Sequence, residues 1–139
     1  MNVMATLIEQ SGDAYRRCFG CGTENPIGLR LVFRNEDGAA VADFCPRQEY
    51  QGWDRMIHGG IVLTMLDETL AYAALFAAGP AVTAEISARL RKPGPMDQAY
   101  RLRGTVSKVR LGLVQAEATI HTVDGTLIAE ATGKFMLIR

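Results

Sequence analysis

An excess of charge of either sign is the first thing this sequence lacks. Fifteen lysines and arginines oppose fifteen aspartates and glutamates in 139 residues, so the formal net charge is zero. Without a basic patch or a run of like charge, the chain has neither the electrostatic footprint of a nucleic-acid-binding protein nor that of a charged, disordered tail. We therefore expect no nucleic-acid partner.

Cysteine is also scarce. Three cysteines, an odd number, fit a reducing cytosol better than a disulfide scaffold. The first residues lack the basic segment and short apolar region of a secretory leader. These absences predict a cytoplasmic protein. The length, with 48% hydrophobic and 22% charged residues, predicts a single domain over residues 1–139 with a core of its own.

The longest apolar run extends from Ile61 to Ala78 and contains no proline, glycine or basic residue. Alanine, leucine and methionine dominate it, which predicts a helix of about five turns that is buried on most faces. Gly79-Pro80 is a usual helix stop. The run approaches membrane-spanning length, but Asp67 and Glu68 at its middle argue against a membrane partner.

Outside this helix the hydrophobic period is two, which predicts two strands before the helix and four after it. The connections are short and Asp124-Gly125 is a hairpin signal, so we expect antiparallel pairing. The order predicts an α+β fold, in which a curved antiparallel sheet of five to six strands wraps around one long central helix. The alternating apolar residues are Leu29, Leu31 and Phe33; Ala40, Ala42 and Phe44; Val82 to Leu90; Tyr100 to Val106; Val114 to Ile120; and Leu127 to Leu137.

His58-Gly59-Gly60 opens the helix. Glycines there leave the first N–H groups bare, near the positive end of the helix dipole. A carboxylate inside an apolar helix, such as Asp67, is costly unless it has a partner or a task. Together these parts can polarise a carbonyl and activate water against it. The structural alternatives are a tight turn with positive φ for the glycines and a buried acid with a partner for Asp67.

Gly59 and Asp67 are eight residues apart, which is about 12 Å along one helix. A carbonyl donor and an attacking group must each lie within about 3 Å of the reacting atoms. If both residues are catalytic, they therefore come from different subunits with antiparallel helices. This predicts a homodimer with two shared sites, and leaves open a homotetramer built as a dimer of dimers.

Asp67 and Glu68 project about 100° apart around the helix, so we expect only one of them to face a given site. Ala71 and Ala74 lie beyond Asp67 on its face and leave room for a ligand, whereas Tyr72 lies beside Glu68. Asp67 is therefore favoured as the catalytic acid, and Glu68 as an assisting or interface group.

The order of elements, with H-G-G-x-x-x-x-x-x-D from His58 to Asp67, resembles the hotdog fold. It looks most like acyl-CoA thioesterases of the 4-hydroxybenzoyl-CoA and phenylacetic-acid-pathway type. The C-F-G-C-G-x-x-N-P-x-G-L stretch that begins at Cys18 is similar to a subset of them. The resemblance implies that the Gly59 N–H polarises the thioester carbonyl, that Asp67 is general base or nucleophile, and that His58 shapes the acyl pocket. The predicted catalytic set is Asp67, Gly59, His58 and Gly60.

The sequence departs from that family at the position six residues before the histidine, where an Asn or Gln often lies near the attacking water. Here the residue is Gly52, with Gln51 beside it as a substitute. A Ser or Thr of the third strand often assists as well, and Thr83, Glu85 and Ser87 are equal candidates. The predicted substrate contacts are Gln51, Trp53, Glu68, Thr83 and Arg91.

Two of these contacts have alternatives. Trp53 forms either a pocket wall or a loop anchor. Arg91, with Arg89 and Lys92, meets coenzyme A phosphates or lies on a solvated face.

Cys18-x-x-Cys21 has the spacing of half a zinc site or of a redox pair. The chain has no second pair and Cys45 is alone, although two subunits could pool four thiolates. We therefore expect a packing role, in which the turn at 25–28 places a loop near the ligand mouth, and assign neither a metal nor a cofactor.

The sequence thus predicts a thioesterase that hydrolyses an acyl-CoA, or a related acyl thioester, to a free acid and a thiol. One alternative is a non-catalytic acyl-CoA-binding or sensing protein. The other is an acyl-CoA hydratase or dehydratase, whose pattern of a His in a proline-rich loop followed by an acid is not present. Steady turnover separates an enzyme from a sensor, and release of free thiol separates hydrolysis from hydration.

Overall fold

The structure, a computed structural model, describes residues 15–138. The helix and strands follow the predicted order. They are β1 (Arg34–Glu36), β2 (Ala39–Phe44), the 3-10 turn η1 (Gln48–Tyr50), α2 (Gly59–Ala78), β3 (Ala81–Leu90), β4 (Tyr100–Arg110), β5 (Leu113–Thr122) and β6 (Leu127–Leu137).

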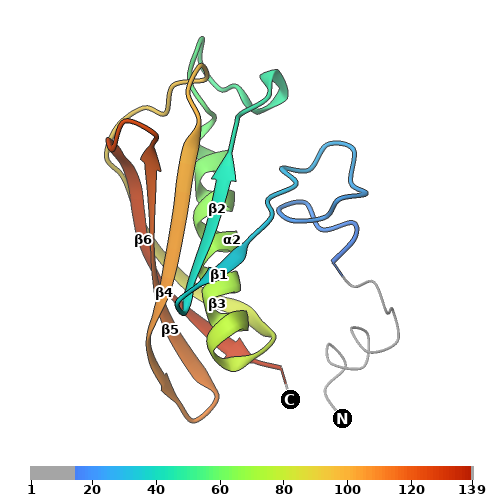
Figure 1. The fold of residues 1–139 in the computed structure, drawn as a ribbon, viewed down its shortest axis with the longest axis vertical. Coiled ribbons are helices and arrows are strands. Elements are labelled where there is room, and N and C mark those ends of the chain that lie inside the picture. The colour runs from blue at the N-terminus through green and yellow to red at the C-terminus, as the bar shows by residue number, and fades with distance from the viewer. Residues whose placement is uncertain (1–14, 139) are drawn as a thin grey trace.

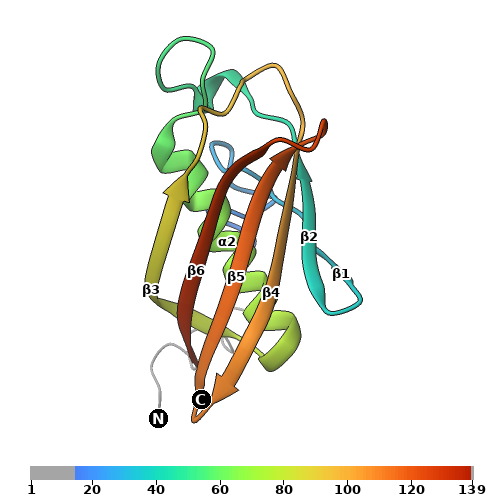
Figure 2. The same cartoon turned by 90° about the vertical axis from the view of Figure 1, so that its left-hand side faces the viewer.

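The strands form one antiparallel sheet in the order β1-β2-β4-β5-β6-β3, so β3 and β1 are its two edges. Figure 2 looks onto this sheet and shows α2 lying behind it. In Figure 1 the sheet lies on one side of α2 and the segment 15–31 on the other. The predicted sheet around one central helix is confirmed, with six strands.

One stripe of α2 is completely covered because it packs into the curve of the sheet. The stripe follows the helical period and consists of Val62, Met65, Leu66, Thr69, Leu70, Ala73 and Ala74. The Thr69 hydroxyl is satisfied within the helix by donating to the Met65 carbonyl at 2.7 Å. By length and composition alone α2 could cross a membrane, but packing in the core accounts for its apolar character.

The helix approaches β4 most closely at Gly104. A Cβ atom at this position would lie 2.7 Å from the Thr69 carbonyl oxygen and 3.0 Å from the Thr69 side chain. Because the carbonyl belongs to the helix backbone, it cannot move aside as a flexible side chain could. A glycine on β4 therefore fixes how deeply α2 lies in the sheet.

The first predicted strand is wrong in its position. Leu29, Leu31 and Phe33 precede β1, and they pack on the core and the helix rather than in the sheet. The N–H groups of Leu29 and Leu31 donate to the carbonyls of Phe19 and Gly20, at 2.8 and 3.0 Å. The alternation of apolar and polar residues over 29–33 predicted correctly which side chains face the core. The backbone of this segment, however, forms a loop and not a strand.

The predicted alternation of the edge strand β3 is broken by a register shift against β6 between Thr83 and Glu85. Because Thr83 pairs with the buried Phe135, it faces the helix, and Val82 faces away from it. Val82 and Leu90, at the two ends of the strand, are 39% and 46% exposed. The strand has ten residues and only β6 as a neighbour. A long edge with exposed apolar side chains is a surface suited to pairing with another chain.

We expect Gly104→Ala to lower the free energy of unfolding by roughly 1–3 kcal/mol, because the added methyl group overpacks the contact with α2. Urea unfolding followed by circular dichroism measures this. The matched control is Thr105→Ala on the exposed face of the same strand, with an expected change within about 0.5 kcal/mol. Equal stability of Gly104→Ala and the native protein would contradict the packing described.

Candidate active site

His58 caps the N-terminus of α2. Its Nδ1 accepts the Gly60 N–H at 2.9 Å, and its carbonyl accepts the N–H groups of Ile61 and Val62 at 2.9 and 3.1 Å. Within the described part of the chain, the Gly59 N–H has no acceptor. His58, Gly59 and Gly60 are all exposed. The structure thus places a free, solvent-facing donor at the positive end of the helix dipole.

A left-handed turn does not explain the glycine pair, because neither Gly59 nor Gly60 has a positive φ. A Cβ atom at Gly59 would meet only the Leu90 Cδ2 atom, at an ordinary 3.6 Å. The described chain therefore has room for a larger residue at position 59.

Asp67 has one hydrogen-bond partner on the edge strand. The Thr83 hydroxyl donates to Asp67 Oδ1 at 2.7 Å. Thr83 is thus chosen from the three polar candidates on β3, and Glu85 instead approaches Lys134 at 4.0 Å. Among the described residues, Asp67 Oδ2 has no hydrogen-bond partner.

A cavity of about 260 Å³ lies against these residues. Asp67, Glu68 and Thr83 supply its acidic and hydroxyl groups. The rest of its lining is largely apolar, with small residues beside the acids, and includes Ala71, Tyr72, Leu75, Pro80, Ala81 and Val82. Both acids border this space, so the expectation that only one of them faces the site is wrong.

Glu68 points toward a different neighbour from Asp67. The Cys18 thiol donates to Glu68 Oε1 at 3.5 Å. Burial raises the pKa of Glu68, the hydrogen bond from Cys18 opposes this, and the charge of Asp67 adds to the rise. Among the described residues, Glu68 forms no hydrogen bond with Tyr72, the neighbour suggested by helical spacing, and the Tyr72 ring stacks on Phe33 with centroids 4.6 Å apart.

The loop that follows residue 50 does not bring Gln51 or Trp53 to this cavity. Gln51 Oε1 accepts the Arg55 N–H at 3.2 Å, and Trp53 is 83% exposed. A Cβ atom at Gly52 would lie 2.9 Å from His58 Cα, so the loop as folded leaves no room for a side chain at this position. Arg91, also outside the cavity, is exposed and pairs with Glu130 at 3.2 Å.

Gly59 and Asp67 lie at different levels along the edge strand. Gly59 lies beside Leu90, whereas Asp67 is bonded to Thr83 near the other end of β3. The cavity includes Asp67 but not Gly59. One chain therefore does not bring the predicted donor and the predicted acid together.

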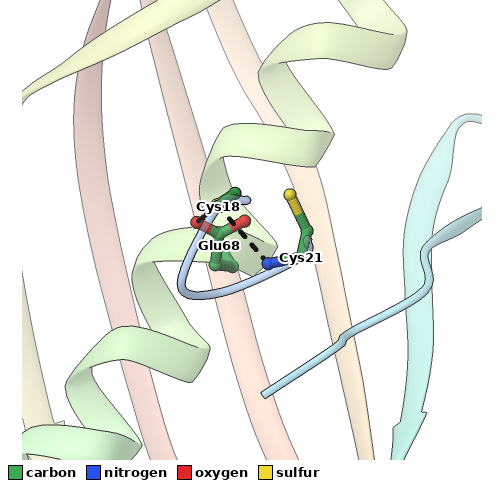
Figure 3. Close-up of side chains that lie close together, drawn as sticks. All are labelled: Cys18, Cys21 and Glu68. Carbon is green, nitrogen blue, oxygen red and sulfur yellow. Dashed lines mark hydrogen bonds between the residues drawn. The ribbon is translucent and has the colours of Figure 1, made fainter. Parts of the chain in front are cut away.

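Sequence reasoning did not place Cys18 and Cys21 at the cavity, yet both line it. The 25–28 turn is held farther along, where Arg47 donates to the Gly28 carbonyl at 3.0 Å. The sequence feature that could have indicated this contact is Gly20, which lies between the two cysteines. A Cβ atom there would lie 2.2 Å from Glu68 Cγ, so glycine allows the loop to close over the helix (Figure 3).

A six-stranded antiparallel sheet around one long helix, with an acid of that helix on a cavity at the edge strand, defines a protein of the hotdog fold. Residues 55–129, more than half of the chain, match the family described as the Thioesterase superfamily. The chain belongs to that superfamily.

The bovine acyl-coenzyme A thioesterase THEM4 is 26% identical over 133 residues, which are 94% of this chain and 55% of that protein. The chain thus spans about half the length of this curated relative. The crystal structure of RHA08564, a thioesterase superfamily protein, has a TM-score of 0.79 at 26% identity, covering 84% of this chain and 61% of that one.

Two more distant structures share the fold. PaaI of the E. coli phenylacetic acid degradation operon has a TM-score of 0.75 at 17% identity, covering 98% of this chain and 92% of that one. A hypothetical thioesterase of Streptococcus pneumoniae with coenzyme A has a TM-score of 0.71 at 18% identity, covering 76% and 86%.

The same substitution at two glycines should have opposite consequences for stability. We expect Gly52→Ala to cost roughly 1–3 kcal/mol of unfolding free energy, because its methyl group meets the His58 backbone. Gly59→Ala should stay within about 0.5 kcal/mol of the native protein, or exceed it, since alanine favours the helix. Urea unfolding of both variants tests this, and a large loss at position 59 would show that the fold itself requires that glycine.

Proposed function

We propose that this protein hydrolyses the thioester of an acyl-CoA or a related acyl thioester, with Asp67 activating the attacking water. The observation that carries the proposal is the position of Asp67 on a largely apolar cavity. Thr83 holds one of its carboxylate oxygens, and the other has no partner among residues 15–138. Membership of the Thioesterase superfamily and the similarity to an acyl-coenzyme A thioesterase support the reaction class. The coenzyme A in a structure of the same fold supports the substrate class.

Asp67 Oδ2 accepts a proton from water as the water oxygen bonds to the thioester carbon. The carbonyl oxygen gains negative charge, and a backbone N–H aimed at it lowers the energy of that state. The C–S bond then breaks, and the thiolate leaves and takes up a proton. In the alternative route Asp67 itself attacks and forms an anhydride with the acyl group. Thr83 positions the carboxylate in both routes.

The Gly59 N–H of the partner subunit supplies this donor in the proposed dimer. Antiparallel pairing of two β3 edges around a two-fold axis near the middle of the strand brings the Thr83 end of one chain to the Leu90 end of the partner subunit. Asp67 is bonded to Thr83 and Gly59 lies beside Leu90. The same symmetry therefore brings Asp67 of one chain to the level of Gly59 of the partner subunit, and creates two equal sites.

Asp67→Asn keeps the size of the side chain but cannot accept the proton, so we expect release of free thiol to fall by about 10²–10⁴-fold. The assay uses short, medium, long and aromatic acyl-CoAs and also identifies the preferred acyl class. Glu117→Gln, an exposed acid on β5 outside the cavity, is the matched control. Undiminished activity of Asp67→Asn would reject the assigned acid, and tight binding without turnover by the native protein would favour a sensor.

Mixing two inactive variants tests whether the site is shared. Gly59→Pro removes the donor N–H, and proline suits the first helical position. We expect Gly59→Pro and Asp67→Asn each to be inactive alone. After unfolding and refolding together, a 1:1 mixture should recover up to about a quarter of native activity, since half of the dimers are mixed and one of their two sites is intact. No recovery, with mixed dimers shown by native mass spectrometry, would place both residues in one subunit's site.

A further inference from the structure

We propose that Cys18, Cys21 and Glu68 form a binding site for a thiophilic divalent cation of the zinc type, which fastens the loop 18–22 onto α2. This site shares the wall of the cavity that Asp67 borders, and the proposal does not rest on thioester hydrolysis. It joins two donors from the N-terminal segment with one from the middle of the helix (Figure 3).

The three donors already converge. Both sulfur atoms and a Glu68 carboxylate oxygen lie within 4.8 Å of one another. Cys18 Sγ and Glu68 Oε1 are 3.5 Å apart. Zinc binds sulfur at about 2.3 Å and carboxylate oxygen at about 2.0–2.2 Å, so donors around one tetrahedral ion lie less than about 4 Å apart. Small side-chain shifts would bring the three groups to these distances.

The loop backbone holds the donors in place. The Gly22 N–H donates to the Cys18 carbonyl at 2.8 Å, and a Cβ atom at Gly22 would lie 2.4 Å from Cys18 N. Glycine is therefore needed at position 22, where the neighbouring atoms belong to the backbone. At position 20 the neighbour is the Glu68 side chain, which is flexible.

The Cys21 N–H lies 3.4 Å from Cys18 Sγ, so the backbone of the loop directs a hydrogen-bond donor at the first sulfur. A bound Zn²⁺ would displace the protons of its ligands and neutralise the charge that they then carry.

Mixed sulfur and oxygen donors, with C-x-x-C spacing, suit zinc rather than a hard cation such as Mg²⁺. The structure supplies three protein ligands, which leaves one position of a tetrahedral ion for water. The other uses of a C-x-x-C pair are a hydrogen-bonded dithiol without metal and a disulfide, and the experiment separates all three.

The test titrates Co²⁺ and Zn²⁺ into the full-length, reduced protein. We expect one cation per chain, a thiolate-to-cobalt charge-transfer band, and a higher Tm with Zn²⁺ because the ion binds the folded state. Cys18→Ser and Cys21→Ser should lose the band. Glu68→Gln should weaken binding by about tenfold or more, at least as much as the loss of an outer-shell partner. Cys45→Ser, at an exposed cysteine outside the cluster, should behave as the native protein.

Absence of the band in the reduced native protein would overturn the proposal in favour of a metal-free dithiol. If the band is absent and thiol counting before reduction finds two fewer thiols than expected, the pair is a disulfide. A band that persists in both cysteine variants would also overturn it. If those variants fail to fold, Glu68→Gln and the native spectrum still decide. Binding is measured without substrate, so its failure is separate from failure of hydrolysis.

Discussion

The burial of α2 in the curve of the sheet is the constraint on which the rest of the molecule depends. Seven of its residues are covered, and Gly104 lets the Thr69 carbonyl approach β4 directly. A helix held this closely can neither rotate nor slide without losing the core. The directions of every other side chain on α2 are therefore fixed.

Two consecutive acids acquire different surroundings because the helix cannot turn. Asp67 is directed to the edge strand, where Thr83 bonds one of its oxygens. Glu68, one position further, is directed to the loop and the Cys18 thiol. An apolar helix can carry both only because each has a polar neighbour, since an unpartnered buried carboxylate is costly. The adjacent pair thus supplies one group to the proposed hydrolytic site and one to the proposed cation site.

Periodicity predicted the helix and the positions of β2 to β6, and the short connections predicted antiparallel pairing. The segment 29–33 shows where this fails: its side chains alternate, but alternation does not identify the backbone that accepts its hydrogen bonds. The contact between Cys18 and Glu68 was also beyond sequence reasoning, because fifty positions separate the two residues. Such contacts depend on how a loop closes, which no local pattern encodes.

The glycines of the chain differ in whether the packing of the folded chain leaves room for a side chain in their place. Gly20, Gly22, Gly52 and Gly104 each lie where a Cβ atom would come within 3 Å of another part of the same chain. Gly59 is different, because the described chain leaves room for a side chain there and its N–H has no acceptor among residues 15–138. Alanine at the start of a helix would be at least as stable. In the proposed dimer this is the position at which the thioester carbonyl of the substrate lies against the helix of the partner subunit, so the proposed function gives a use to a glycine that the packing of the described chain does not require.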